Sequence, residues 1–229
     1  MEEIWNGFVK AIQLIVTLDP EVMEITGRSL AIAAASCLLA TAICIPLGSL
    51  IHFNRFAGKR ALINVIQTMY SVPTVVIGLL VFLLFSRAGP LGYMELLFTP
   101  TVMVIGQAVL IAPIVAGLTI TALSGVDKAV PETATALGAD RFQVALLTMR
   151  EARFAMLTAI VMGFGRAISE VGLALMVGGN IRGYTRVLTT AIALETSKGD
   201  IELSIALGII LIAVALIINI ALNRLQQRK

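Results

Sequence analysis

The chain has 229 residues, of which 58% are hydrophobic and only 14% are charged. Soluble domains carry about 25% charged residues, so this composition argues against a soluble enzyme and favours a protein dissolved in lipid. The net charge of +3 is too small to indicate nucleic-acid binding, and no cluster of metal-ligating side chains stands in any apolar segment.

The first predicted element, within residues 1–26, is an amphipathic helix followed by an outer linker. About 15 residues are available before Asp19, whereas a membrane span needs about 20. We therefore expect a helix that lies in the membrane interface, with a short sixth span as the alternative. Its apolar residues recur at helical spacing: Ile4, Phe8, Ile12, Ile15 and Val16.

Residues 27–229 are predicted to form one transmembrane domain with about five spans. Each apolar segment is long enough to cross about 30 Å of hydrocarbon as a helix. Continuous apolar runs favour helices over barrel strands, in which apolar and polar residues alternate. The expected spans are Leu30–Ile51, Leu62–Phe85, Val102–Leu123, Phe154–Val177 and Leu203–Leu222.

Three of these spans contain an internal proline, at Pro46, Pro73 and Pro113. Proline removes a backbone donor and favours a kink. Neighbouring helices can tolerate such kinks, or the kinks can shape a pathway, and the sequence leaves both interpretations open. Cys37 and Cys44 lie in the first span and are expected to be buried free thiols.

A polar stretch, 124–153, lies between the third and fourth spans. Pro131 suits the first turn of a helix, and Glu132 beside it meets the positive end of the helix dipole. Gly138 can end that helix in a left-handed conformation. Asp140, with a glutamine three residues later, is typical of a capping box that begins the next helix. The stretch therefore predicts a short helix, a tight turn and a second helix.

The short helix carries a small, partly apolar face that suits a groove on another protein. That face is formed by Thr133, Ala134 and Leu137. The pattern Glu132-Thr133-Ala134, three residues, Gly138 resembles the coupling loop of ABC-importer permeases, whose pattern is Glu-Ala-Ala, three residues, Gly. The family pattern often continues with Ile-x-Leu-Pro, but here those positions read Thr148-Met149-Arg150-Glu151. The resemblance implies contact with an ATPase through Glu132, Thr133, Ala134, Leu137, Gly138, Ala139 and Asp140.

The fourth span carries Arg166 and Glu170, which a continuous helix would place on one face. Charges at membrane depth cost about 2.5–3.5 kcal/mol each on insertion scales, so they face a cavity, a partner helix or each other. A structural ion pair and an element of a translocation path or gate are both open interpretations.

Beyond this span, Gly178, Gly179 and Asn180 begin an outer loop that continues to Arg182 and Arg186. Exposed amides and arginines there can help an anion along a path. They can equally form a basic rim for a substrate-binding protein, or the loop can be a plain turn.

The segment Phe164-Gly165-Arg166-Ala167-Ile168-Ser169-Glu170-Val171-Gly172, followed by Gly179-Asn180-Ile181, resembles permeases of importers for molybdate, sulfate and tungstate. The likeness is greatest to the tungstate permeases. It implies an all-α, type I ABC-importer permease fold and a path or gate that includes Arg166, Glu170, Gly178, Gly179 and Asn180. It also implies a homodimer, two cytoplasmic ATPase subunits and an extracytoplasmic binding protein, in a prokaryotic plasma membrane.

The chain lacks the Gly-x-x-x-x-Gly-Lys-Ser/Thr nucleotide loop, so ATP and magnesium are expected on the separate ATPase, with no cofactor in this chain. Basic residues orient the chain, because cytoplasmic loops of membrane proteins carry the excess. Placing the polar stretch and the C-terminus inside puts ten of them in the cytoplasm and five outside. The inner set is Arg55, Lys59, Arg60, Lys128, Arg141, Arg150, Arg153, Arg224, Arg228 and Lys229, and the outer set is Arg28, Arg87, Arg182, Arg186 and Lys198.

Two other functions fit less of the sequence. A secondary transporter is expected to carry several intramembrane carboxylates or an inverted repeat, and only Glu170 lies at depth. An integral-membrane enzyme needs a cluster of reactive side chains, and the one histidine, His52, lies in a basic loop. Because no dedicated oxyanion pocket is visible, we expect the permease itself to bind tungstate weakly.

Overall fold

In the computed structural model, residues 2–227 are described, apart from the side chains at positions 222, 223 and 225–227. All regular elements in this range are helices. Arg228 and Lys229, two of the expected cytoplasmic cations, lie outside the described residues. The elements are α1 (Glu2–Val16), α2 (Pro20–Phe53), α3 (Lys59–Thr68), η1 (Met69–Ser71), α4 (Thr74–Phe85), η2 (Gly92–Met94), α5 (Pro100–Ser124), α6 (Ala129–Ala136), α7 (Arg141–Glu151), α8 (Arg153–Ile168), α9 (Gly172–Gly178), α10 (Leu188–Lys198) and α11 (Ile201–Gln227).

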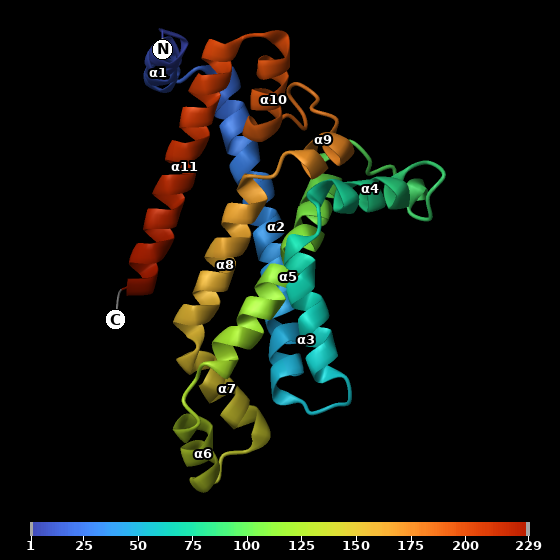
Figure 1. The fold of residues 1–229 in the computed structure, drawn as a ribbon, viewed down its shortest axis with the longest axis vertical. Helices are drawn as coiled ribbons and strands as arrows, with labels where there is room; N and C mark the ends of the chain where they lie inside the picture. Colours follow the sequence, from blue (N-terminus) through green and yellow to red (C-terminus); the bar gives the residue numbers. More distant parts are fainter. Residues whose placement is uncertain (1, 228–229) are drawn as a thin grey trace.

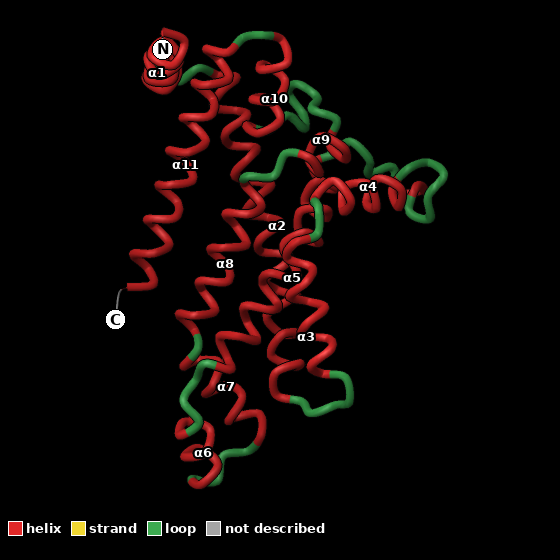
Figure 2. The backbone as a smooth tube through the Cα atoms, in the orientation of Figure 1, coloured by secondary structure: helices red, strands yellow, loops and turns green. Residues whose placement is uncertain are grey.

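Helices α2, α5, α8 and α11 run along the long axis of the molecule, and α4 projects sideways from them (Figure 1). Loops gather near the two ends of the long helices and around α4 (Figure 2). Small residues let α2 and α5 approach closely, as is usual in membranes. A β-carbon on Gly48 would lie 2.9 Å from the Ala116 carbonyl oxygen.

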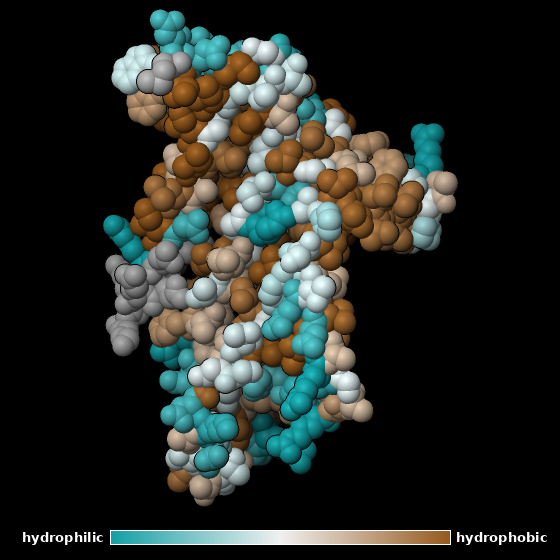
Figure 3. Space-filling model, viewed as in Figure 1, coloured by the Kyte–Doolittle hydropathy of each residue, from teal (hydrophilic) through white to brown (hydrophobic). Residues whose placement is uncertain are grey.

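The core lies where α2, α4, α5, α8 and α9 meet. Its fully buried members include Met103, Ile111, Leu173 and Val177. Brown apolar surface covers α4 and the upper part of α11, whereas teal polar surface lies at the two ends of the molecule and in a patch midway along the bundle (Figure 3). This distribution suits a bundle that spans a bilayer, because apolar side chains there face lipid. Cys37 and Cys44 are buried free thiols, as expected.

In the described residues, three helices are long and apolar enough to cross a membrane by themselves, or up to five if each of two bent pairs is one span. The expectation of a single helix over 62–85 is wrong, because α3–η1 and α4 meet at 99°. Val72 and Pro73 are extended there, with ψ of 130° and 129°. Proline disfavours helical conformation in the residue before it, which breaks the helix. Pro46 and Pro113 instead lie inside α2 and α5.

The fourth expected span is also interrupted, since α8 and α9 meet at 61°. The break covers Ser169, Glu170 and Val171. Glu170 is therefore not on a continuous helix with Arg166, which corrects the expected geometry. At this break the buried Glu170 carboxylate accepts a hydrogen bond from the backbone amide of Leu173.

The N-terminal helix α1 is 15 residues long and is seen end-on when the long helices are vertical (Figure 1). It therefore lies across the bundle, as an interfacial helix would. Gly7 packs under Ile205 of α11, where a β-carbon would lie 2.6 Å from the isoleucine side chain. Helix α2 begins at Pro20, capped by the Asp19 carboxylate, so the expected linker up to residue 26 is partly helical.

Candidate functional site

Helices α6 and α7 form a helix–turn–helix that protrudes beyond one end of the bundle (Figure 1). Gly138 lies in the turn with φ of +86°, in the left-handed region that glycine adopts without strain. The Gly138 and Ala139 amides donate to the carbonyls of Thr135 and Ala134, both at 3.0 Å, and so close the end of α6. The conformation expected for Gly138 is thus present.

Helix α7 begins with the capping box that the sequence predicts. The Gln143 amide donates to the Asp140 carboxylate at 2.8 Å, and the Asp140 amide donates to the Gln143 side chain at 2.9 Å. Glu132 lies in the first turn of α6, where its charge complements the helix dipole. These local hydrogen bonds hold the turn in one conformation, unlike a flexible linker.

The exposed apolar surface of this unit differs from the expected one. Ala134 is buried against its own chain, whereas Leu137 is 83% exposed. Phe142, on the first turn of α7, is 76% exposed and was not predicted as a site residue. An exposed aromatic side chain at a protruding tip indicates a binding surface. The presence of a phenylalanine in this polar stretch was the sequence signal for it.

A cavity of about 810 Å³ separates this tip from the end of α2. Arg55 and Arg141 both line it, so its walls carry positive charge, and Phe53 and Phe142 add apolar area. The tip thus offers an apolar knob beside a basic recess, a combination that suits a partner with an acidic, concave surface.

The charged pair of the fourth span lies toward the other end of the molecule. An Arg166 guanidinium nitrogen lies 2.9 Å from Glu170 Oε2, and the Glu170 side chain is only 2% exposed. Glu170 Oε1 also accepts the Leu173 amide at 3.0 Å, which caps the first turn of α9. The Thr189 hydroxyl donates to the Glu170 carbonyl at 2.7 Å. Glu170 therefore connects α8, α9 and α10. The sequence did not indicate the contribution of Thr189 to this connection.

Of the two glycines that begin the outer loop, Gly178 packs against the core, whereas Gly179 is exposed beside Phe98. A β-carbon on Gly178 would lie 2.7 Å from the Met103 sulfur, and the Thr185 hydroxyl donates to the Gly178 carbonyl. Gly179 and Asn180 are both left-handed, with φ of +69° and +51°. The Asn180 Oδ1 atom is buried and has no hydrogen-bond partner in the described part of the chain.

The loop arginines are engaged in ion pairs. Arg182 forms two hydrogen bonds with Glu21 of α2, at 2.9 and 2.5 Å, and Arg186 approaches the same carboxylate at 3.5 Å. The Glu21 hydrogen bond and charge raise the pKa of Arg182 above its usual value. A basic rim at this loop is therefore partly neutralised by α2, which the sequence did not predict.

The two predicted sets of site residues thus lie apart along the bundle. The residues from Glu132 to Asp140 form the protruding turn, and Arg166, Glu170, Gly178, Gly179 and Asn180 surround α9 (Figure 1). Helices α5 and α8 run between the two regions.

A family model described as "Binding-protein-dependent transport system inner membrane component" matches residues 44–229. The "Tungstate uptake system permease protein TupB" of Peptoclostridium acidaminophilum is 41% identical over 99% of this chain and 100% of the relative. The protein of the same name in Campylobacter jejuni is 35% identical over 99% of this chain and 95% of the relative. The "Sulfate transport system permease protein CysW" of Synechococcus elongatus is 28% identical over 86% and 74% of the two chains.

Among solved structures, a bacterial alginate ABC transporter in complex with a periplasmic protein bound to an alginate pentasaccharide aligns with a TM-score of 0.76 at 20% identity. The match covers 100% of this chain and 87% of that one. The inward-facing MetNI methionine ABC transporter aligns with a TM-score of 0.74 at 17% identity, over 92% and 97% of the two chains. These alignments confirm the predicted all-α permease fold of type I ABC importers.

Proposed function

The chain belongs to the family of binding-protein-dependent transport system inner membrane components, and on that premise we propose that it is the permease subunit of an ABC importer that carries tungstate into the cytoplasm. Identity to the two TupB permeases over nearly the whole chain carries the substrate assignment. The sulfate permease is more distant and matches less of the chain, so tungstate is favoured over sulfate. Permeases for molybdate or sulfate are the alternative.

The protruding turn is the proposed contact with the ATPase. The Leu137 and Phe142 side chains supply exposed apolar area, and Arg55 and Arg141 supply charge for an acidic recess. The bonds around Gly138 and Asp140 keep the turn in one conformation, so a movement of the ATPase is transmitted to α5 and α8 without first ordering a loop.

The proposed assembly is a homodimer with two ATPase subunits and a binding protein outside the membrane. The turn and the C-terminus face the cytoplasm, and α1, α9 and α10 lie toward the outer side. ATP binding would draw the turns together and open the path outward, and hydrolysis would return it inward. This subunit performs no covalent chemistry in the cycle, because ATP and magnesium are held by the ATPase.

The proposed path or gate includes Arg166, Glu170, Gly178, Gly179 and Asn180. The break between α8 and α9 is held by the Arg166–Glu170 pair and by Thr189, so a change at this pair would move α9 and the outer loop together. Arg166, the one cation in this set, already pairs with the Glu170 carboxylate, which supports weak binding of tungstate by the permease itself. Calorimetry should then show no submicromolar affinity for the isolated permease.

The test measures ATPase activity of the permease reconstituted with its ATPase and binding protein, with tungstate, molybdate and sulfate titrated separately. Half-maximal stimulation at the lowest concentration for tungstate is expected. An equal or better response to molybdate or sulfate would replace the substrate and keep the importer. Absence of any co-purifying ATPase would overturn the importer itself.

Two substitutions at the turn, Gly138→Asp and Glu132→Lys, should abolish substrate-stimulated ATPase activity and leave membrane insertion intact. Gly58→Asp is a matched control, since Gly58 has the same φ of +86° and the same empty surroundings as Gly138. Glu151→Lys, on exposed residue 151 at the end of α7, controls for charge reversal. Normal transport by both turn variants would refute the coupling role.

A further inference from the structure

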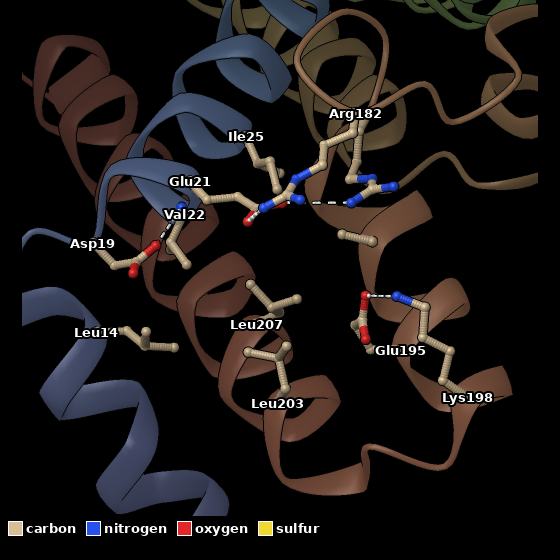
Figure 4. Close-up of a pocket in the computed structure, with 12 residues that line it drawn as sticks. Leu14, Asp19, Glu21, Val22, Ile25, Arg182, Glu195, Lys198, Leu203 and Leu207 are labelled. Carbon is tan, nitrogen blue, oxygen red and sulfur yellow. Dashed lines mark hydrogen bonds and ion pairs between the residues drawn. The ribbon is translucent and has the colours of Figure 1, made fainter.

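A second cavity lies where α1, α2, α10 and α11 meet, away from the turn and from the Arg166–Glu170 pair. Its volume is about 490 Å³. Its floor is apolar, and its rim carries charged side chains (Figure 4). The apolar wall consists of Leu14, Val22, Ile25, Ala191, Leu203 and Leu207. No part of the proposed transport cycle uses this cavity.

The rim charges are balanced. Three carboxylates, from Asp19, Glu21 and Glu195, face three cations, from Arg182, Arg186 and Lys198. A site for a free oxyanion such as the transported substrate is expected to carry an excess of donors and positive charge. A neutral rim over an apolar floor instead matches a ligand that has both signs of charge and an apolar tail.

Several rim groups keep unused hydrogen-bonding capacity. Asp19 uses one oxygen to cap α2 at 3.0 Å from the Val22 amide, and Glu195 uses one to pair with Lys198 at 2.8 Å. Within residues 2–227, no hydrogen bond engages the second oxygen of either carboxylate. Among the described residues, Arg182 donates to Glu21 through Nε and Nη2 and Arg186 donates through Nη1, so Arg182 Nη1 and Arg186 Nη2 have no hydrogen bond. These two nitrogens can donate to an acceptor-rich group of a ligand.

The free groups are separated in space. Asp19 and Glu195 lie on opposite sides of the cavity, with Leu203 and Leu207 between them, and Arg182 borders the cavity beside Glu21 (Figure 4). A donor-rich ligand group can therefore bind near a carboxylate while an acceptor-rich group binds near the arginines.

Helix α1 places this cavity at the depth of lipid headgroups. It lies across the ends of the long helices, and its exposed apolar residues include Trp5 and Phe8, at 67% and 45% exposure. Aromatic residues of this kind favour the membrane–water interface. The Leu14 side chain of α1 borders the cavity, so the cavity opens where this interface would be.

We propose that this cavity binds one glycerophospholipid with an ethanolamine headgroup. The phosphate accepts hydrogen bonds from Arg186 and Arg182, the ammonium group donates to the free oxygen of Asp19, and the upper part of an acyl chain covers the leucines. The proposal relies on the outward placement of α1 in the proposed function, but not on transport.

The test measures lipid retention by the full-length permease, purified with its partner subunits and reconstituted in nanodiscs that contain equal amounts of phosphatidylethanolamine and phosphatidylcholine. After detergent extraction, mass spectrometry should find about one ethanolamine lipid per chain. Its enrichment over the choline lipid should be about ten-fold, the ratio that one charge-assisted hydrogen bond provides. A trimethylated ammonium cannot donate those bonds, so equal retention of the two lipids would overturn the proposal.

Two variants separate the headgroup contacts. Asp19→Asn keeps an oxygen for the α2 cap but removes the charge, so the preference for ethanolamine should fall about ten-fold. Arg186→Gln should lower retention of both lipids, since both carry the phosphate. Arg87→Gln and Glu95→Gln are the controls, because both residues are exposed and lie outside the cavity, and they should change neither quantity.

Competing occupants give different outcomes. Displacement of the lipid by millimolar inorganic phosphate or tungstate would identify a free-anion site and overturn the proposal. Weaker docking of the binding protein to Asp19→Asn and Arg186→Gln, with lipid retention unchanged, would identify a protein-docking surface and overturn it as well. If the wild-type chain retains the ethanolamine lipid but does not transport tungstate, only the proposed function is overturned.

Discussion

Two helix breaks in this molecule have different chemical causes. Between α3–η1 and α4 the chain turns by 99° at Pro73, a residue that has no amide hydrogen to continue a helix. Between α8 and α9 it turns by 61° at Glu170, whose carboxylate binds Arg166 and caps α9. The first bend is favoured by the backbone of Pro73 and is supported by the packing of α4 against α5 and α9, whereas the second depends on an ion pair and a hydrogen bond. We therefore expect the first to persist through a transport cycle and the second to be able to change.

The largest effect is expected for Glu170→Ala, which removes both the partner of Arg166 and the cap of α9. Breaking a largely buried pair leaves an uncompensated charge, so the free energy of unfolding should fall by about 2 kcal/mol or more. Thermal unfolding in detergent measures this, with transport measured in parallel. Glu170→Gln keeps an acceptor for the Leu173 amide and should lose less. Equal losses in the two variants would mean that the cap contributes nothing.

Gly117→Ala tests whether the Pro73 break is fixed by packing as well as by proline. Tyr70, in η1 just before the break, covers Gly117 so closely that a β-carbon would lie 1.7 Å from the phenol oxygen. Overpacking of this kind should lower the free energy of unfolding by about 1–3 kcal/mol, as chemical denaturation would show. Adding Tyr70→Phe removes the clashing oxygen and should recover part of the loss. No recovery would show that Tyr70 does not constrain this region.

Thr189→Val removes the hydroxyl that donates to the Glu170 carbonyl at 2.7 Å. Because one buried hydrogen bond is lost and the side-chain shape is kept, the stability loss should be about 1 kcal/mol. Hydrogen exchange of the α9 amides should accelerate relative to α4. Unchanged exchange in α9 would contradict the idea that α10 holds this break.

The smallest effect is expected for Pro73→Ala. Alanine tolerates the extended conformation, and the 99° bend is also held by α5 and α9, so stability should change by less than about 1 kcal/mol. Spin labels at the ends of α3 and α4 should report an unchanged mean distance. A shift to the length of a continuous helix would show that proline alone maintains the bend.

Local signals made the turn of α6 and α7 predictable. Pro131, Gly138, Asp140 and Gln143 act on bonds within a few residues, so their effects can be inferred without knowing the rest of the fold. The role of Glu170 depends on Thr189, which comes from another helix, and no local pattern indicates that contact.

Burial at the tip was equally unpredictable. Ala134 and Phe142 are both compatible with an amphipathic helix, and only the packing of α6 against α7 decides that one is covered and the other exposed. The pairing of Glu21 with Arg182 and Arg186 likewise joins segments far apart in the sequence, so the loop looked more basic than it is.

Because α1 packs across α11, α1 cannot reach its final contacts until α11 has been synthesised. The Asn6 side chain donates to Glu202, and the two residues are separated by 196 positions. At about 5–20 residues per second, a ribosome needs about 10–40 s to make the second partner after the first. During that interval α11 does not yet cover the apolar face of α1, and we expect α1 to bind to the bilayer surface through this face. Helix α11, which is made much later than α1, thus fixes the position of α1.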